Sequence, residues 1–160
     1  MLNYRKTKPC DDADTARIIR SSLEKLHLNV PGTAYFDPES DHLSTYYNSA
    51  PEKLAYFVAA DDEGHIVDGT GIAEFDGMEN CAELQKLYLD DTVIGKGCGK
   101  ELLKTAEDFA RSAGYKNLYL ETHSSLTAAL NLYEKTDYRQ IEKPCSAQNG
   151  AMNRFYLKEL

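Results

Sequence analysis

Residues 93–100 read Val-Ile-Gly-Lys-Gly-Cys-Gly-Lys, and they separate a segment that favours a strand from a segment that favours a helix. Residues 81–89, before this loop, are expected to form a strand that follows two earlier ones in a meander. Residues 100–113, after it, carry their apolar side chains on one helical face. Three glycines let consecutive backbone N–H groups point one way, and the helix N-terminus adds the positive end of its dipole. The stretch therefore predicts a strand–loop–helix unit whose loop binds phosphate oxygens.

The spacing within this loop argues against a nucleoside triphosphatase. A Walker loop has four residues between its first glycine and a Gly-Lys pair, and Ser or Thr follows the lysine. Here three residues separate Gly95 from Gly99, and Glu101 follows Lys100. The loop fails the pattern on both counts.

A dinucleotide-binding oxidoreductase stays open at this point. The fingerprint of such sites is Gly-x-Gly-x-x-Gly; Gly95 and Gly97 fit it, but Lys100 stands in place of the third glycine. Glu121, at the end of the next expected strand, would suit a ribose contact. The strands that precede the loop weaken this interpretation, because a dinucleotide-binding unit usually begins its domain.

The remaining periodicities predict a mixed α/β fold with helices on both faces of one sheet. Asp11 or Asp12 would cap the first helix, and Gly114 suits the end of the third. Because residues 81–89 and 117–122 flank a right-handed crossover, these two strands should be parallel. The expected helices cover residues 11–28, 41–47, 100–113 and a segment that begins after Ser124 or Ser125; the expected strands cover 54–60, 66–75, 81–89, 117–122, 138–141 and 152–157.

Composition narrows the class of partner. The chain has 160 residues, which suits one domain over residues 1–160, and its formal net charge of −8 argues against nucleic acid as a partner. The N-terminal residues do not resemble a signal peptide, and no apolar stretch is long enough to span a membrane. The four cysteines form no Cys-x-x-Cys pair, so neither a zinc site nor a redox motif is indicated. We therefore expect a cytoplasmic protein with no metal and no membrane partner.

Three segments in this order resemble the GCN5-related N-acetyltransferase (GNAT) family. They are the strand 83–89, the loop 94–100 and the later segment 129–135, which contains Leu-Tyr-Glu-Lys. Gly97 and Gly99 occupy the glycines of the family's Arg/Gln-x-x-Gly-x-Gly/Ala pattern. The resemblance covers essentially the whole chain. It implies a mostly antiparallel mixed sheet of about six to seven strands, with one parallel splayed pair and about four flanking helices.

The resemblance also implies a cofactor and a reaction. The family uses acetyl-CoA as co-substrate and transfers the acetyl group directly to a primary amine of a small molecule or a protein N-terminus. The glycine loop would hold the CoA pyrophosphate, and the gap between the splayed strands would hold the pantetheine arm. A backbone N–H near Leu89 would polarise the thioester carbonyl. The residues implied in cofactor binding are Leu87, Tyr88, Leu89, Ile94, Gly95, Lys96, Gly97, Cys98, Gly99, Lys100, Leu126 and Ala129.

Two residues match catalytic positions of the family. Glu83 lies on the strand before the loop and would accept a proton from the ammonium substrate, directly or through water. Tyr133 would protonate the departing thiolate, although it also shares a stripe with core residues of its helix. The side chain of Cys98 is expected to point toward the core.

Departures from the family pattern keep a second class of function open. Ile94 stands where the family usually has Arg or Gln, and Leu126 stands where Asn often contacts CoA. Lys96 or Lys100 would compensate for the missing charge, but a CoA-binding sensor without catalysis remains an alternative. The acceptor side is expected in residues 27–51, where aromatic side chains and carboxylates would suit a small amine cation. A homodimer is possible in this family.

Overall fold

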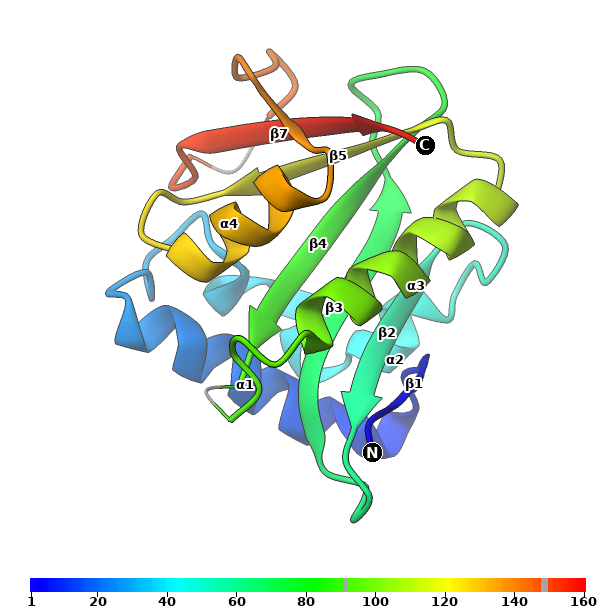
Figure 1. Cartoon of the computed structure of the whole chain (residues 1–160), viewed down its shortest axis with the longest axis vertical. Helices are drawn as coiled ribbons and strands as arrows, with labels where there is room; N and C mark the ends of the chain where they lie inside the picture. Colours follow the sequence, from blue (N-terminus) through cyan, green and yellow to red (C-terminus); the bar gives the residue numbers. More distant parts are fainter. Residues whose placement is uncertain (91, 148–149) are drawn as a thin grey trace.

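The protein folds around one seven-stranded sheet in the order β1-β2-β3-β4-β5-β7-β6 (Figure 1). The computed structural model describes residues 1–90, 92–147 and 150–160, so residue 91 of the expected loop lies outside the described residues. All neighbouring strands are antiparallel except β4 and β5, which are parallel as expected. The strands are β1 Asn3–Lys6, β2 Ala55–Ala60, β3 Ile66–Glu74, β4 Cys81–Leu89, β5 Asn117–Thr122, β6 Arg139–Ile141 and β7 Arg154–Glu159.

Helices cover both faces of the sheet, as the sequence predicts. Phe57 faces the core formed with α3 and α4, whereas Tyr56 and Val58 face the core formed with α1 and α2. This alternation follows from the two-residue period of a strand. In Figure 1, α3 and α4 lie in front of the sheet. The helices are α1 Asp12–Lys25, α2 Leu43–Tyr47, α3 Cys98–Ser112 and α4 Thr127–Lys135, with short 3-10 helices at Pro9–Asp11, Ala34–Phe36 and Pro38–Asp41.

The parallel pair β4–β5 separates after three residue pairs. The pairing runs from Cys81–Asn117 to Glu83–Tyr119 and stops there, while β5 continues along β7 as far as Thr122. In Figure 1 the two strands diverge from the end near the C-terminus. The second half of β4 therefore presents a backbone edge that no described strand covers, and the predicted splay is confirmed.

A β-bulge shapes this second half of β4. The register against β3 shifts between Gly69 and Gly71, so two residues of β4 lie opposite one residue of β3. Lys86, inside the bulge, has φ of 55°, an uncommon value for a residue with a side chain. Such bulges bend a strand and redirect its side chains.

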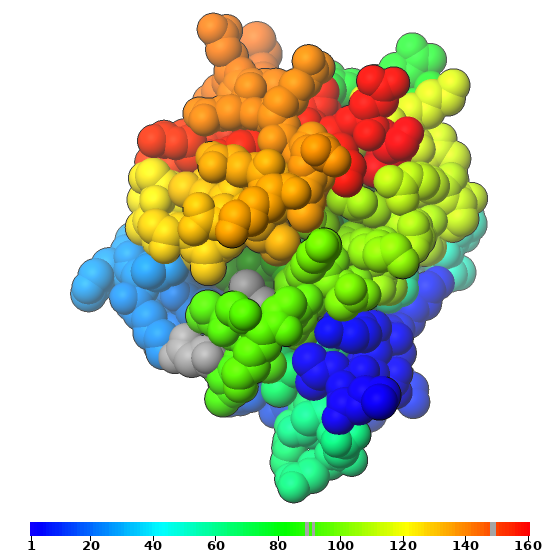
Figure 2. Space-filling view, in the orientation of Figure 1, coloured from blue at the N-terminus to red at the C-terminus, as the bar shows by residue number. Residues whose placement is uncertain are grey.

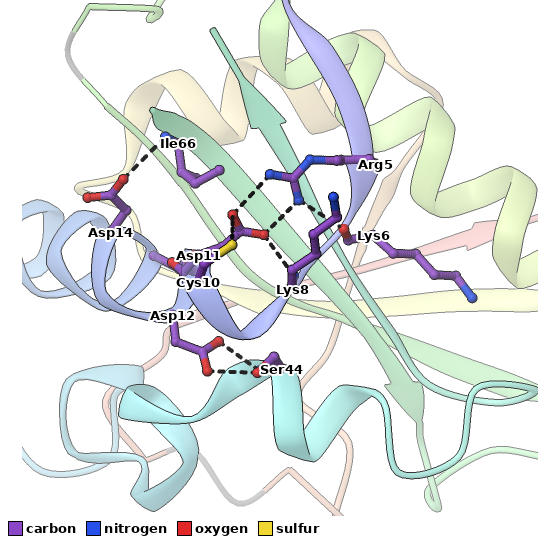
Figure 3. A network of polar contacts seen from close by, with 10 residues as sticks. Arg5, Lys6, Lys8, Cys10, Asp11, Asp12, Asp14, Ser44 and Ile66 are labelled. Atoms are coloured by element: carbon purple, nitrogen blue, oxygen red, sulfur yellow. Dashed lines mark hydrogen bonds and ion pairs between the residues drawn. The ribbon is translucent and has the colours of Figure 1, made fainter. Parts of the chain in front are cut away.

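The N-terminal strand β1 was not predicted from the sequence. Its four residues pair with β2, and a partly buried ion pair fixes them to the start of α1 (Figure 3). Arg5 donates two hydrogen bonds to the Asp11 carboxylate, at 2.7 and 2.9 Å, and the Lys8 backbone N–H donates a third at 2.7 Å. Asp11 therefore anchors β1 instead of capping the helix, which begins at Asp12 without a side-chain cap.

Several helix boundaries also differ from the expected ones. The third helix begins at Cys98, two residues early, because Gly97 adopts a left-handed conformation before it. The fourth begins at Thr127, and neither expected serine caps it. The backbone N–H of Ser124 bonds to Asn153, and that of Ser125 bonds to His123. Gly114 has φ of 93°, which confirms its predicted place at a helix end.

Candidate active site

A groove lies between the glycine loop and α4. Its volume is about 190 Å³, and its surface is mainly apolar. In Figure 2 the green surface of the loop and the yellow-to-orange surface of α4 border a hollow on this face. The groove brings together five of the expected cofactor residues: Leu87, Tyr88, Ile94, Leu126 and Ala129. Ser22, Lys25 and Leu26 of α1 and its C-cap complete one wall.

The glycine loop has the geometry of an anion site. Gly95 and Gly97 have φ of 79° and 82°, and open space surrounds the position where each would carry a Cβ. The backbone N–H groups of the first turn of α3 have no earlier carbonyl within the helix to bond. Lys96 and Lys100 are exposed beside these groups. The loop therefore offers free backbone donors at the start of α3, while the Lys96 N–H already bonds to the Val93 carbonyl at 3.1 Å and the Lys100 side chain lines a separate pocket beside Glu107.

Cys98 contributes backbone, not its thiol, to this surface. Its side chain is buried and donates to the Asp68 carboxyl over 3.5 Å, as the expected inward orientation requires. Burial raises the pKa of Asp68 to about 7, although the Gly69 N–H and the Cys98 thiol bond to it. Tyr4 lies beside the thiol. The loop thus rests on a buried polar cluster of Tyr4, Asp68 and Cys98.

The end of β4 lies beside the groove. Leu87 and Tyr88 line it, and the backbone of Leu89 pairs with Asp68 of β3. The side chain of Leu89 lies outside the described residues, so its predicted contact stays a prediction. Because β5 has turned away, the backbone groups on this edge remain available to an extended ligand.

An acidic cavity of about 440 Å³ contains Glu83. A smaller cavity of about 80 Å³ shares Glu83 with it and reaches Tyr88, which also lines the apolar groove. The small cavity therefore lies between the groove and the larger cavity, with Tyr88 as the wall that it shares with the groove. The polar residues of the larger cavity include Asp37, Glu39, Glu74, Asp76, Glu83, Gln85, Lys86 and Glu121.

Glu83 faces this acidic cavity and is held by its neighbour on the strand. Gln85 donates a hydrogen bond from Nε2 to Glu83 Oε1 at 2.6 Å, and the Tyr47 hydroxyl donates to Gln85 Oε1 at 2.6 Å. Burial raises the pKa of Glu83; the bond from Gln85 opposes this effect, and the charge of Glu121 adds to it. A carboxyl group with a raised pKa beside a cavity is a candidate general base.

Lys86 links the cavity to the segment before α2. Its ammonium group lies 2.8 Å from Asp37 and 3.3 Å from Glu39, and the side chain is 5% exposed. Burial opposes its charge, but the two carboxylates outweigh this effect and raise the pKa of Lys86. The bulge in β4 thus directs a buried cation toward the acceptor-side segment.

Tyr133 lies deeper than the groove. Ala129, one turn earlier on the same face of α4, lines the groove, while the Tyr133 ring packs against Tyr138 and Tyr156. Burial raises the pKa of Tyr133, and the nearby Tyr88 contributes to the rise. In the described part of the chain no side chain hydrogen-bonds to its hydroxyl. Its predicted catalytic role stays a prediction.

Only part of the segment expected on the acceptor side, residues 27–51, lines the acidic cavity. Asp37 and Glu39 line the cavity, but Asp41 pairs with Arg20 at 2.7 Å outside it. Glu121 lies in the acidic cavity with Glu83, whereas a ribose contact would require it beside the glycine loop.

Sequence reasoning missed Gln85 and Lys86. The strand alternation from Glu83 places Gln85 on the same face, but no local pattern indicates the bulge that redirects Lys86.

Comparison with known proteins identifies the family. Residues 22–138 match the model of the acetyltransferase (GNAT) family. The chain is 37% identical over 134 residues to the N-acetyltransferase YjgM of Escherichia coli. The aligned residues make up 82% of this chain and 78% of that protein. The protein therefore belongs to the GNAT family of acetyltransferases, and the dinucleotide-binding alternative is set aside.

Solved structures share the whole fold. An acetyltransferase of the GNAT family from Staphylococcus aureus superposes with a TM-score of 0.84 at 20% identity, over 99% of both chains. A phosphinothricin acetyltransferase of Sinorhizobium meliloti, solved in complex with acetyl-CoA, has a TM-score of 0.76 at 17% identity, over 99% of this chain and 88% of that one. Among the described helices, none is long and apolar enough to cross a membrane.

Proposed function

We propose that this protein transfers an acetyl group from acetyl-CoA directly to a primary amine. The observation that carries the proposal is that an apolar groove beside the glycine loop and a small cavity that contains Glu83 share Tyr88 as a wall, and that the small cavity also shares Glu83 with the larger acidic cavity. A donor in the groove and an amine in the small cavity would meet at Tyr88 in a fixed orientation. Such alignment lowers a bimolecular barrier by about 7–11 kcal/mol in favourable cases.

The residues of the groove fit CoA. The loop N–H groups between Gly95 and Lys100, apart from that of Lys96, which bonds to the Val93 carbonyl, would bind the pyrophosphate. Lys96 or Lys100 would supply the positive charge that Ile94 does not. The apolar walls at Leu87, Leu126 and Ala129 suit the aliphatic parts of the pantetheine arm, and the free edge of β4 suits its amides. When bound, acetyl-CoA supplies an activated acetyl thioester.

Two proton transfers accompany the exchange of a C–S bond for a C–N bond. Glu83 accepts the proton that the ammonium acceptor must lose before its nitrogen can attack. Tyr133 gives a proton to the thiolate that leaves. A backbone N–H of β4 near Leu89 polarises the carbonyl oxygen as negative charge develops on it. The reaction would take place in the cytoplasm, a reducing compartment that suits four free cysteines.

A CoA-binding sensor is the second candidate, and Ile94 and Leu126 are the residues that favour it. Thermal unfolding with acetyl-CoA, CoA or NADH, followed by an assay of amine-dependent thiol release, separates the candidates. We expect stabilisation by acetyl-CoA, about 2.7 kcal/mol at 100 times its dissociation constant, and thiol release that depends on added amine. Stabilisation without turnover across amines of several classes would favour the sensor. Stabilisation by NADH alone would exclude both candidates.

A further inference from the structure

The acceptor side of the site carries more negative charge than one ammonium group needs. Six carboxylates line the acidic cavity, and Lys86 is the one Lys or Arg side chain among the described lining residues. Asp37 and Glu39 already pair with Lys86. Among the described residues no Lys or Arg forms an ion pair with Asp76, Glu83 or Glu121, although the charge of Lys86 acts on Glu83 and that of Lys143 acts on Glu121.

The Glu74 carboxylate belongs to the opposite face of the sheet. Its register partner is Ala82 of the core beneath α3, whereas Glu83 pairs with Ala73. Lys53 lies 3.7 Å from the Glu74 carboxylate, and both line a separate pocket, so Glu74 is not counted with the carboxylates that face the acceptor. The cavity walls concentrate the field of the remaining carboxylates on its interior.

The other three carboxylates lie in two places. Glu83 and Glu121 form an inner set on the splayed strands; both also line the small cavity that reaches Tyr88. Asp76 lies farther out, in the turn after β3. Ala73 of β3 is the register partner of Glu83, and Asp76 follows three residues later, which is about 10 Å of extended chain.

We propose that the acceptor is a flexible aliphatic diamine or polyamine. One amino group reaches Glu83 and reacts, and a second, as an ammonium ion, lies at Asp76, roughly 6–10 Å away. This inference rests on the proposed acetyl transfer. The location of the site does not depend on its acidity, because it follows from the small cavity that shares Tyr88 with the cofactor groove in a protein of the GNAT family. The described residues hold no cluster of His, Cys, Asp and Glu suited to a metal ion.

The charge pattern also favours release of the product. Acetylation forms an amide and removes one positive charge from the bound molecule. The product then interacts less with the inner set than the substrate did, so it leaves more readily. The volume of about 440 Å³ suits a small molecule rather than a folded protein surface.

Three amines of five carbons each test the proposal. 1,5-Diaminopentane, n-pentylamine and 5-aminopentanoate have a positive, a neutral and a negative far end, respectively. We expect kcat/KM to fall at least tenfold from the diamine to the monoamine, and again to the amino acid. Calorimetric binding of each amine to the CoA-loaded protein should follow the same order. Equal affinities, or tighter binding of the amino acid, would overturn the proposal.

Asp76 has a matched control in the same turn. Asp76→Asn should reduce the ratio of diamine to monoamine kcat/KM about fivefold or more. Glu79→Gln removes the same charge from an exposed residue of that turn that does not line the cavity, and it should leave the ratio unchanged. An equal effect of both variants would contradict the specific role of Asp76.

The calorimetric measurement distinguishes a failure of the diamine proposal from a failure of the proposed acetyl transfer. Amines that bind in the expected order but are never acetylated would contradict acetyl transfer and support the charge preference. Turnover with no preference for the diamine would support acetyl transfer and contradict the proposal that the acceptor is a diamine or polyamine. A peptide with a free N-terminus that reacts faster than every diamine would assign the cavity to protein substrates, and would overturn the inference.

Discussion

Gln85 connects the Glu83 carboxylate to a buried tyrosine. Its Nε2 donates to Glu83 Oε1 and its Oε1 accepts from the Tyr47 hydroxyl, each at 2.6 Å. The Tyr47 ring is fully buried beside Gly71, where a Cβ would lie 2.6 Å from the hydroxyl oxygen. Because Tyr47 can donate here, the amide of Gln85 has one favoured orientation, in which it presents N–H to Glu83. We infer that Gln85 is a positioning residue for the base.

Replacing Gln85 should shift the pH dependence of the reaction. The bond from Gln85 favours the ionised form of Glu83, so Gln85→Met should raise the pKa of that carboxyl group. A base must be unprotonated, and the acid limb of kcat/KM against pH should therefore move upward by about 0.5–1 pH unit. Tyr47→Phe should give a smaller shift in the same direction. An acid limb that stays in place in Gln85→Met would show that the contact does not act on the base.

Tyr133→Phe tests the proposed proton donor. We expect kcat to fall about 10–100-fold, less than a full general-acid contribution, because water can replace the hydroxyl in part. Affinity for acetyl-CoA should change little, since Tyr133 does not line the groove. Tyr138→Phe is the matched control: its hydroxyl donates to Glu107 at 2.9 Å, so its loss should cost about 1 kcal/mol of stability without reducing kcat. An unchanged kcat in Tyr133→Phe would contradict the role of Tyr133 as proton donor and leave it a packing role in the core.

Alanine substitutions at two glycines distinguish the effect of backbone strain on stability from an effect on acetyl-CoA binding. Gly97 and Gly64 both have positive φ, at 82° and 89°, and both have open space at the Cβ position. Substitution of either by alanine should lower stability by about 1–2 kcal/mol, because alanine disfavours this conformation. Only Gly97→Ala should also weaken acetyl-CoA binding, by tenfold or more in calorimetry. Equal affinity in the two variants would place the pyrophosphate elsewhere.

Asp68 should make stability depend on pH. Its pKa of about 7 in the folded protein exceeds the unfolded value of about 4, so the folded state retains a proton that the unfolded chain releases. Stability from this group is complete below about pH 4 and is lost as pH rises to 7. Asp68→Asn should therefore gain roughly 2–4 kcal/mol relative to the native protein by pH 8.

Denaturant unfolding between pH 5 and pH 8 measures this difference. Asp137→Asn, at an exposed position whose positive φ asparagine also tolerates, is the control and should show no pH-dependent difference. A gain in Asp68→Asn that is the same at both pH values would mean that Asp68 does not titrate in this range.

The sequence predicted what depends on local pattern. Apolar periodicity placed the sheet and the long helices, and the loop 94–100 with the Leu-Tyr-Glu-Lys segment indicated the family. The strand β1 escaped prediction because Asn3–Lys6 is polar and short, and a distant strand and the Arg5–Asp11 pair hold it. The same limit applies to the site. Glu83 follows from its strand position, but the acidic cavity joins β3, β4, β5 and the segment before α2, which only the tertiary fold brings together.

The fate of the acetyl group tests the central claim most directly. With acetyl-CoA labelled with ¹³C in the acetyl carbonyl and 1,5-diaminopentane, the native protein should form one labelled amide for each CoA thiol released. Glu83→Gln should bind acetyl-CoA with unchanged affinity and form the amide at least 100-fold more slowly. Thiol release without labelled amide, or an equal rate in the variant, would contradict direct transfer with Glu83 as the base.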